Sequence, residues 1–258
     1  MVARHWQVLL TCEHASNAVP VALQGCFKGQ RAVLRTHRGY DIGALEVAQQ
    51  LARGLEAPLV AGTITRLLVD LNRSAQHANV HSEFTDVLAP TARAALIEQW
   101  HTPFRAEAWS ALQRLAAVGP VLHLSVHSFT PVWHGEARNC SIGLLYDPAR
   151  RGERLLARSL ATALSVQTAL SVQTALSVHV SERARAAHLS TVSALPVRMN
   201  YPYRGNADGH TTSLRKLLSD VQYLGIEIEL NQALLQRQPQ RHAIADRLIA
   251  AVRTAVDQ

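Results

Sequence analysis

Polar side chains that could bind a metal or transfer a proton stand at the ends of several apolar runs in this 258-residue chain. An open α/β sheet binds its ligands beyond the carboxyl ends of its strands, so residues in such positions are candidates for one shared site. Five groups meet this description: Glu13 with His14, Asp41, Asp70 with Asn72 and Arg73, His127 after the run VLHLSV, and Glu229 in GIEIELNQ.

Each group alone has an ordinary structural explanation. A histidine after a strand is commonly a hydrogen-bonded core residue, Asp41 could cap a helix, and Asp70 could pair with Arg73. Glu229 could pair with a basic neighbour. As a set, however, imidazole and carboxylate groups from several strand ends are costly to bury without a shared partner. A divalent metal with bound water is the commonest such partner, so the set indicates a metal site able to activate water.

The elements that would position these residues alternate along the chain. Strands are expected at 6–12, 59–70, 121–126, 140–146, 195–200 and 223–230, and helices at 41–55, 91–119, 151–164 and 241–256. Pro103 is expected to kink or split the helix at 91–119. This alternation predicts an α/β protein, a three-layer α/β/α sandwich around a mostly parallel mixed sheet.

The chain is expected to form a single domain over 1–258, because no Gly, Ser or Pro-rich linker divides it. One stretch, 162–178, reads TALSVQTALSVQTALSV and repeats a six-residue unit almost three times. A period of six suits neither a helical nor a heptad pattern, and the copies are too short for a solenoid. We interpret this stretch as a tandem duplication that lengthens a helix end or a surface loop.

Charge and cysteine content restrict the class of partner. Lys and Arg number 26 against 19 Asp and Glu, which favours an anionic partner, either nucleic acid or a small carboxylate. The arginines are dispersed, aromatic residues make up 5%, and no nucleic-acid recognition motif is present, so nucleic acid is the weaker candidate. The three scattered cysteines favour a reducing compartment. The apolar run VLL near the N-terminus fits neither a signal peptide nor a membrane span, so we expect a cytoplasmic protein.

Five segments together resemble a known family. The chain resembles the N-formylglutamate amidohydrolase family from residue 6 to about 235, in the segments EHASNAVP, YDIGA, VDLNRS, VHSFTP and IEIELNQ. Within that family, the resemblance is stronger to the branch known as predicted N-formylglutamate amidohydrolases. In the same order, these segments are distantly similar to the carboxypeptidase A-type zinc peptidases. The resemblance implies a zinc-peptidase-like (phosphorylase/hydrolase-like) fold with one zinc ion per chain, although another divalent metal could take its place.

The resemblance also implies a ligand set, with His14 and His127 as two of the zinc ligands. The peptidases carry a glutamate three residues after the first histidine, but Asn17 stands there and is a poor zinc ligand. Another residue must supply the carboxylate. The resemblance of YDIGA, after a strand-like segment, to the amidohydrolase family implies Asp41, with Glu13 as the alternative. Since neighbouring residues on a strand point to opposite faces, Glu13 could share a metal with His14 only if the chain turns there.

The chemistry implied is hydrolysis of an amide next to a free carboxylate. Zinc would activate a water molecule, Glu229 would act as the general base, and Arg73 beside Asn72 would hold the substrate carboxylate. The loop at 198–215 resembles the family's substrate loop and adds further candidates for substrate binding or oxyanion stabilisation: Arg198, Asn200, Tyr203 and Arg204. His37 and His210 are weaker candidates, and His101 is expected to be a surface or packing residue.

We therefore expect a zinc-dependent amidohydrolase that acts on a small N-acyl amino acid such as N-formylglutamate. The alternative is a family member that binds a small carboxylate ligand without hydrolysis, because Asn17 and an altered ligand set have weakened the metal site. The sequence leaves the acyl group, the identity of the metal and the oligomeric state open.

Overall fold

The computed structural model describes residues 6–177 and 195–256, without the side chains of 166–177. Six strands form one sheet: β1 (Gln7–Cys12), β2 (Leu59–Ala61), β3 (Val121–Phe129), β6 (Ile142–Leu145), β7 (Val197–Met199) and β8 (Tyr223–Asn231). Their order is β2-β1-β3-β8-β6-β7, and every pair is parallel except β6 with β8. A small hairpin of β4 (Val132–Trp133) and β5 (Glu136–Ala137) follows β3.

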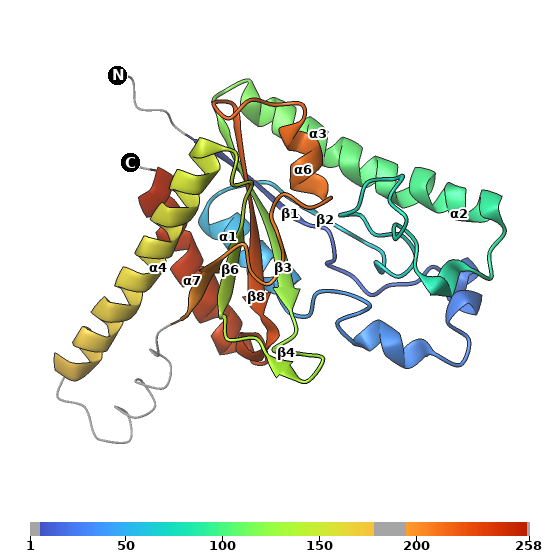
Figure 1. Ribbon diagram of the computed structural model, residues 1–258, viewed down its shortest axis with the longest axis horizontal. Coiled ribbons are helices and arrows are strands. Elements are labelled where there is room, and N and C mark those ends of the chain that lie inside the picture. Colours follow the sequence, from blue (N-terminus) through green and yellow to red (C-terminus); the bar gives the residue numbers. More distant parts are fainter. Residues whose placement is uncertain (1–5, 178–194, 257–258) are drawn as a thin grey trace.

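Helices cover both faces of the sheet (Figure 1). The α-helices are α1 (Ala44–Gly54), α2 (Pro90–Leu96), α3 (Thr102–Ala116), α4 (Arg151–Ser177), α6 (His210–Arg215) and α7 (Gln238–Val256). Short 3-10 helices lie at Val21–Phe27, Arg31–Arg35, Glu83–Thr85 and Gln232–Leu234. One apolar core joins α1, α4 and α7 to one face, and a second joins α3, α6 and the segment 60–84 to the other. The predicted α/β sandwich with a mostly parallel mixed sheet is confirmed.

The long helix expected at 91–119 extends from 90 to 116 and is interrupted where expected. A π-helical turn at Ile97–His101 separates α2 from α3, immediately before Pro103. Proline has no backbone N–H to donate to the preceding turn, which accounts for the irregular hydrogen bonding at this point.

The strand expected at 59–70 is wrong beyond its first three residues. At Gly62 the chain passes so close to Glu13 that an added Cβ would lie 2.1 Å from the Glu13 carbonyl oxygen. From there it leaves the sheet, and Leu67, Leu68 and Val69 pack in the core beneath α3. The apolar run therefore reflects burial rather than strand structure.

The repeat at 162–178 continues α4, whose last residue is Ser177, and residue 178 lies outside the described residues. No helix in the described ranges is long and apolar enough to cross a membrane.

Candidate metal centre

One face of the central strands is polar, and this face carries the site. On β3, Leu122, Leu124 and Val126 belong to the core beneath α1, α4 and α7. The alternate residues His123, Ser125 and His127 therefore point to the α3 side. Likewise, Glu227 and Glu229 alternate with apolar residues on β8, and Glu229 lies directly opposite His127 in the register of the two strands.

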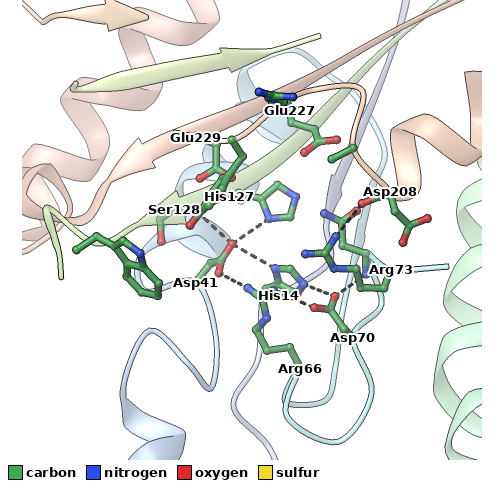
Figure 2. A pocket seen from close by; sticks show the side chains of 15 residues that line it. His14, Asp41, Arg66, Asp70, Arg73, His127, Ser128, Asp208, Glu227 and Glu229 are labelled. Atoms are coloured by element: carbon green, nitrogen blue, oxygen red, sulfur yellow. Dashed lines mark hydrogen bonds and ion pairs between the residues drawn. The ribbon is translucent and has the colours of Figure 1, made fainter. Parts of the chain in front are cut away.

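Three buried residues converge near the carboxyl ends of β1 and β3: His14, Asp41 and His127 (Figure 2). The Nδ1 atoms of both histidines face the same carboxylate oxygen, Asp41 Oδ2. The distances are 2.9 Å from His127 and 3.4 Å from His14. Residues far apart along the chain thus place two imidazole nitrogens and a carboxylate around one point.

Local structure fixes Asp41 in this position. Its backbone N–H donates to the His14 carbonyl over 2.9 Å. The helix α1 begins at Ala44 after Gly43, whose φ of +81° is in the left-handed region, so Asp41 is not the helix cap. Its Oδ2 also accepts a 3.2 Å hydrogen bond from the Ser128 backbone N–H.

A second carboxylate lies behind each of the two histidines. His14 Nε2 is 2.7 Å from Asp70 Oδ1, and Asp70 is paired in turn with Arg66 over 2.8 Å. His127 Nε2 lies 2.9 Å from Ser125 Oγ and 3.3 Å from Glu13 Oε2. With Nε2 engaged in this way, each ring is held with Nδ1 directed toward Asp41.

The electrostatics of the cluster keep its carboxylates ionised. Burial acts to raise the pKa of Asp41, but His14 and His127 outweigh it and hold this pKa well below its ordinary value. Burial acts to lower the pKa of His127, but hydrogen bonds to Asp41 and Glu13 raise it well above its usual value. The metal-free cluster therefore carries a proton that a bound cation would displace.

The residues present fit a zinc ion. Two imidazole nitrogens and one carboxylate form a usual protein ligand set for catalytic zinc, which leaves a position for water. Buried His14 Nδ1 has no hydrogen-bond partner among the described residues, which is costly unless another group binds there. Buried Glu229 Oε2 likewise lacks a partner in the described chain, and it lies at the rim of the same cavity.

A second buried cluster, Glu13, His123 and His210, adjoins the first. Most of its polar atoms pair with one another or with their neighbours, and buried His210 Nε2 is the exception among the described residues. Glu13 Oε1 accepts from Thr11 Oγ1 over 2.8 Å and lies 2.9 Å from His210 Nδ1. Both ring nitrogens of His123 have partners, Thr11 Oγ1 at 2.8 Å and the Tyr223 hydroxyl at 2.7 Å.

The first cluster opens into a cavity of about 440 Å³. Four of the predicted substrate-binding residues line it: Asn72, Arg73, Tyr203 and Arg204. Arg73 Nη1 donates to the Asp208 carbonyl over 3.2 Å, and Asn72 Oδ1 accepts from the His210 backbone N–H over 2.8 Å. Asn72 and Arg73 therefore line the cavity and also hold the loop that precedes α6 through hydrogen bonds.

The other two predicted substrate-binding residues, Arg198 and Asn200, are not among those that line this cavity. Arg198 is exposed, and its guanidinium lies over the Tyr201 ring, 4.8 Å from the centroid. Asn200 adopts a left-handed φ of +49°, and its Oδ1 accepts from the backbone N–H groups of Tyr146 and Gly205. Asn200 therefore shapes the loop, and Arg198 packs on Tyr201.

The remaining polar residues considered in the sequence lie apart from the three ligands. Asn17 lines a separate hollow beside Phe27. His101 is buried and bonds to the Arg73 carbonyl over 2.8 Å, so its expected packing role is confirmed. His210 is fully enclosed in the second cluster, which the sequence reasoning missed. The alternation of His123, Ser125 and His127 along one strand face is the signal that could have revealed this buried polar layer.

Comparison with known proteins identifies relatives. The chain is similar to the solved structure of gene product Atu2144 from Agrobacterium tumefaciens, at 28% identity and a TM-score of 0.74, covering 98% of this chain and 91% of that one. An N-acetylmuramoyl-L-alanine amidase, AmiC2 of Nostoc punctiforme, aligns at 11% identity over 98% of both chains, but with a TM-score of only 0.35. No curated protein matches. The family model for N-formylglutamate amidohydrolase matches residues 6–236, so the chain belongs to the N-formylglutamate amidohydrolase family.

Proposed function

We propose that this protein is a zinc-dependent amidohydrolase that cleaves the amide of an N-acyl amino acid such as N-formylglutamate. Family membership supports amide hydrolysis. The observation that carries the metal dependence is the buried Nδ1 of His14, which has no hydrogen-bond partner in the described chain and lies 3.4 Å from Asp41 Oδ2. The three unpaired cysteines agree with the reducing, cytoplasmic setting that belongs to this proposal.

In this proposal His14, Asp41 and His127 hold the metal. When bound, a zinc ion supplies a Lewis acid that polarises the acyl carbonyl and lowers the pKa of water. Asp70 and Glu13, behind the two histidines, keep the ligand nitrogens oriented.

Glu229 is the proposed general base. Burial raises its pKa to about 8 in the metal-free chain, against the charge of His127 and with the help of Asp41 and Glu227. A carboxylate whose pKa lies near neutrality can both take a proton from water and return it to a leaving amine. Its unpaired Oε2 and its place opposite His127 in the sheet support this role.

Arg73 is the proposed anchor for the substrate carboxylate. Within the described chain, its guanidinium donates one hydrogen bond, from Nη1 to the Asp208 carbonyl. The remaining N–H groups are therefore free to hold a carboxylate in a forked pair of hydrogen bonds. Asn72, Tyr203 and Arg204 line the same cavity and complete the proposed substrate-binding set.

The test is a panel of N-acyl amino acids, N-formyl-L-glutamate included, offered to the zinc-loaded protein and to the same protein after chelation. We expect hydrolysis only with metal, and a loss of about 100-fold to 10,000-fold in kcat for Glu229→Gln with the zinc content unchanged. A Glu229→Gln variant as fast as the parent would remove Glu229 as the base. A folded protein that binds no metal and hydrolyses nothing would instead support the carboxylate-binding alternative.

A further inference from the structure

A second lobe, which also borders Asp41, adjoins the cavity. This lobe, of about 280 Å³, is lined by His37, Phe129 and Thr130, among others. It shares Trp133 and Tyr203 with the main cavity, as well as Asp41, Arg66 and Ser128. The two lobes therefore adjoin each other at Asp41 of the candidate metal centre.

The walls of the two lobes differ in chemistry. Arg73, Arg204, Asp208 and Glu227 line only the main lobe. Phe129 lines only the second lobe, and together with Trp133 and Tyr203 it gives this lobe three aromatic rings. Charged groups also line the second lobe, namely Arg38, Arg66 and Asp41, so its apolar surface is the aromatic wall. The main lobe thus suits a charged amino acid, and the aromatic wall of the second lobe offers contact to an apolar group.

The aromatic wall is held by one arginine. The Arg138 guanidinium carbon lies 5.7 Å from the ring centroid of Phe129, 5.1 Å from that of Trp133 and 5.5 Å from that of Tyr203. Such cation–π contacts keep the rings in place before any ligand arrives. Trp133 and Tyr203 nevertheless remain 47% exposed, so their faces are available for contact.

The hairpin that carries Trp133 adds to this wall. It lies beyond the carboxyl end of β3, the end at which His127 reaches the metal centre (Figure 1). Trp133 stands on β4, and its ring also meets that of His37 edge to face, with 6.1 Å between centroids. A short strand pair thus holds a large ring beside the reacting position.

Resting on the proposed function, we propose that the second lobe binds the acyl group of the substrate, and that the preferred acyl group carries an aromatic or branched apolar body larger than formyl. With the amino acid carboxylate held by Arg73 in the main lobe, the acyl group on the far side of the amide points toward Trp133. A formyl group has one carbon and would leave a lobe of about 280 Å³ to water. An apolar acyl body would replace that water with ring contacts.

The binding test uses zinc-loaded Glu229→Gln, which lacks the proposed base and should not consume its ligand. Isothermal titration calorimetry compares N-formyl-L-glutamate with N-phenylacetyl-L-glutamate. We expect the phenylacetyl compound to bind at least about tenfold more tightly, the size of effect that a few apolar groups have in a pocket. Adding Trp133→Ala should remove most of this preference. Adding Val132→Ala should keep it, because exposed Val132 is on the same strand but lines neither lobe.

Equal affinities for the two compounds, no binding of either, or a preference unchanged by Trp133→Ala would each overturn the acyl-lobe proposal. Turnover by the parent protein separates this failure from a failure of the proposed function. If the parent hydrolyses N-formyl-L-glutamate but binding shows no preference for the phenylacetyl compound, the amidohydrolase proposal stands and the acyl-lobe proposal is wrong. A clear phenylacetyl preference in calorimetry without hydrolysis of either compound would support the lobe and contradict the amidohydrolase.

Discussion

Two buried clusters of histidine and carboxylate lie side by side in this protein, and only one of them borders the cavity. In the cluster of His14, Asp41 and His127, a ring nitrogen is left without a hydrogen-bond partner and the group borders an open cavity. In the cluster of Glu13, His123 and His210, one ring nitrogen, His210 Nε2, also lacks a hydrogen-bond partner among the described residues, but none of the three residues lines the cavity. Access to the cavity is therefore what distinguishes the two clusters.

The histidine pKa values also differ between the two clusters. Asp41 and Glu13 raise the pKa of His127 well above its usual value, despite burial. Burial, and then His210, lower the pKa of His123 to about 3, and burial followed by Arg105 lowers that of His210. The surroundings of the first cluster thus favour a charged imidazole, whereas those of the second favour neutral rings. Similar residue types therefore differ in charge and in access to the cavity.

The largest expected effect separates the two clusters directly. His14→Gln should abolish stoichiometric zinc binding and lower kcat/KM by more than about 1,000-fold, since the metal's contribution of several kcal/mol is lost. His210→Gln is the matched control, because its amide can still reach Glu13, and it should retain one zinc per chain. Elemental analysis and kinetics on both proteins check this. Zinc lost from His210→Gln but kept by His14→Gln would reverse the assignment.

The second prediction uses the cavity that only the first cluster borders. Arg73→Ala should cost about 2 to 4 kcal/mol in kcat/KM, the range for a lost charged hydrogen-bond pair, for substrates with a free carboxylate. The check compares an N-acyl amino acid with its carboxamide derivative in parent and variant. Equal losses on both compounds would contradict the anchoring role.

Glu13 belongs to the second cluster but also touches a ligand of the first. Glu13→Gln should weaken zinc binding about 10-fold to 100-fold, the usual cost of losing an outer partner of a metal-binding histidine. Competition with a chromogenic chelator measures this, with circular dichroism to establish that the variant is folded. Unchanged zinc affinity would mean that Ser125 alone orients His127.

The smallest expected effect is on pH dependence. Because the raised pKa of His127 keeps its ring protonated to higher pH in the metal-free chain, zinc must displace this proton. Zinc affinity should therefore rise as pH increases toward that pKa and fall as pH decreases, with proton release on binding. Calorimetry in buffers of different ionisation enthalpy detects the release, and no released protons would contradict a protonated His127.

Much of the fold could be predicted from the sequence, because the pattern of apolar residues indicates which parts of the chain are buried. The apolar runs of β3 and β8 and the apolar spacing of α1 and α7 predicted elements close to those observed. The strand expected at 59–70 was wrong because burial beneath α3 also produces an apolar run. The strand ends where Gly62 passes close to the Glu13 carbonyl. That is a tertiary contact, which the local sequence pattern does not reveal.

The site was predictable in part for a related reason. His14, Asp41 and His127 could be named because strand ends and family motifs both point to them, and they lie together. Arg198 and Asn200 were grouped with Tyr203 by nearness in sequence. A loop sends successive side chains in different directions, so only Tyr203 and Arg204 reach the cavity. The second cluster was missed because it joins residues 197 positions apart, Glu13 and His210.

The most direct test of the central assignment is a crystal structure of the zinc-loaded protein with anomalous data collected on both sides of the zinc edge. The account predicts one anomalous peak per chain, bonded to Nδ1 of His14, Nδ1 of His127 and the carboxylate of Asp41. A peak among Glu13, His123 and His210 instead, or no peak in protein that hydrolyses its substrate, would contradict it.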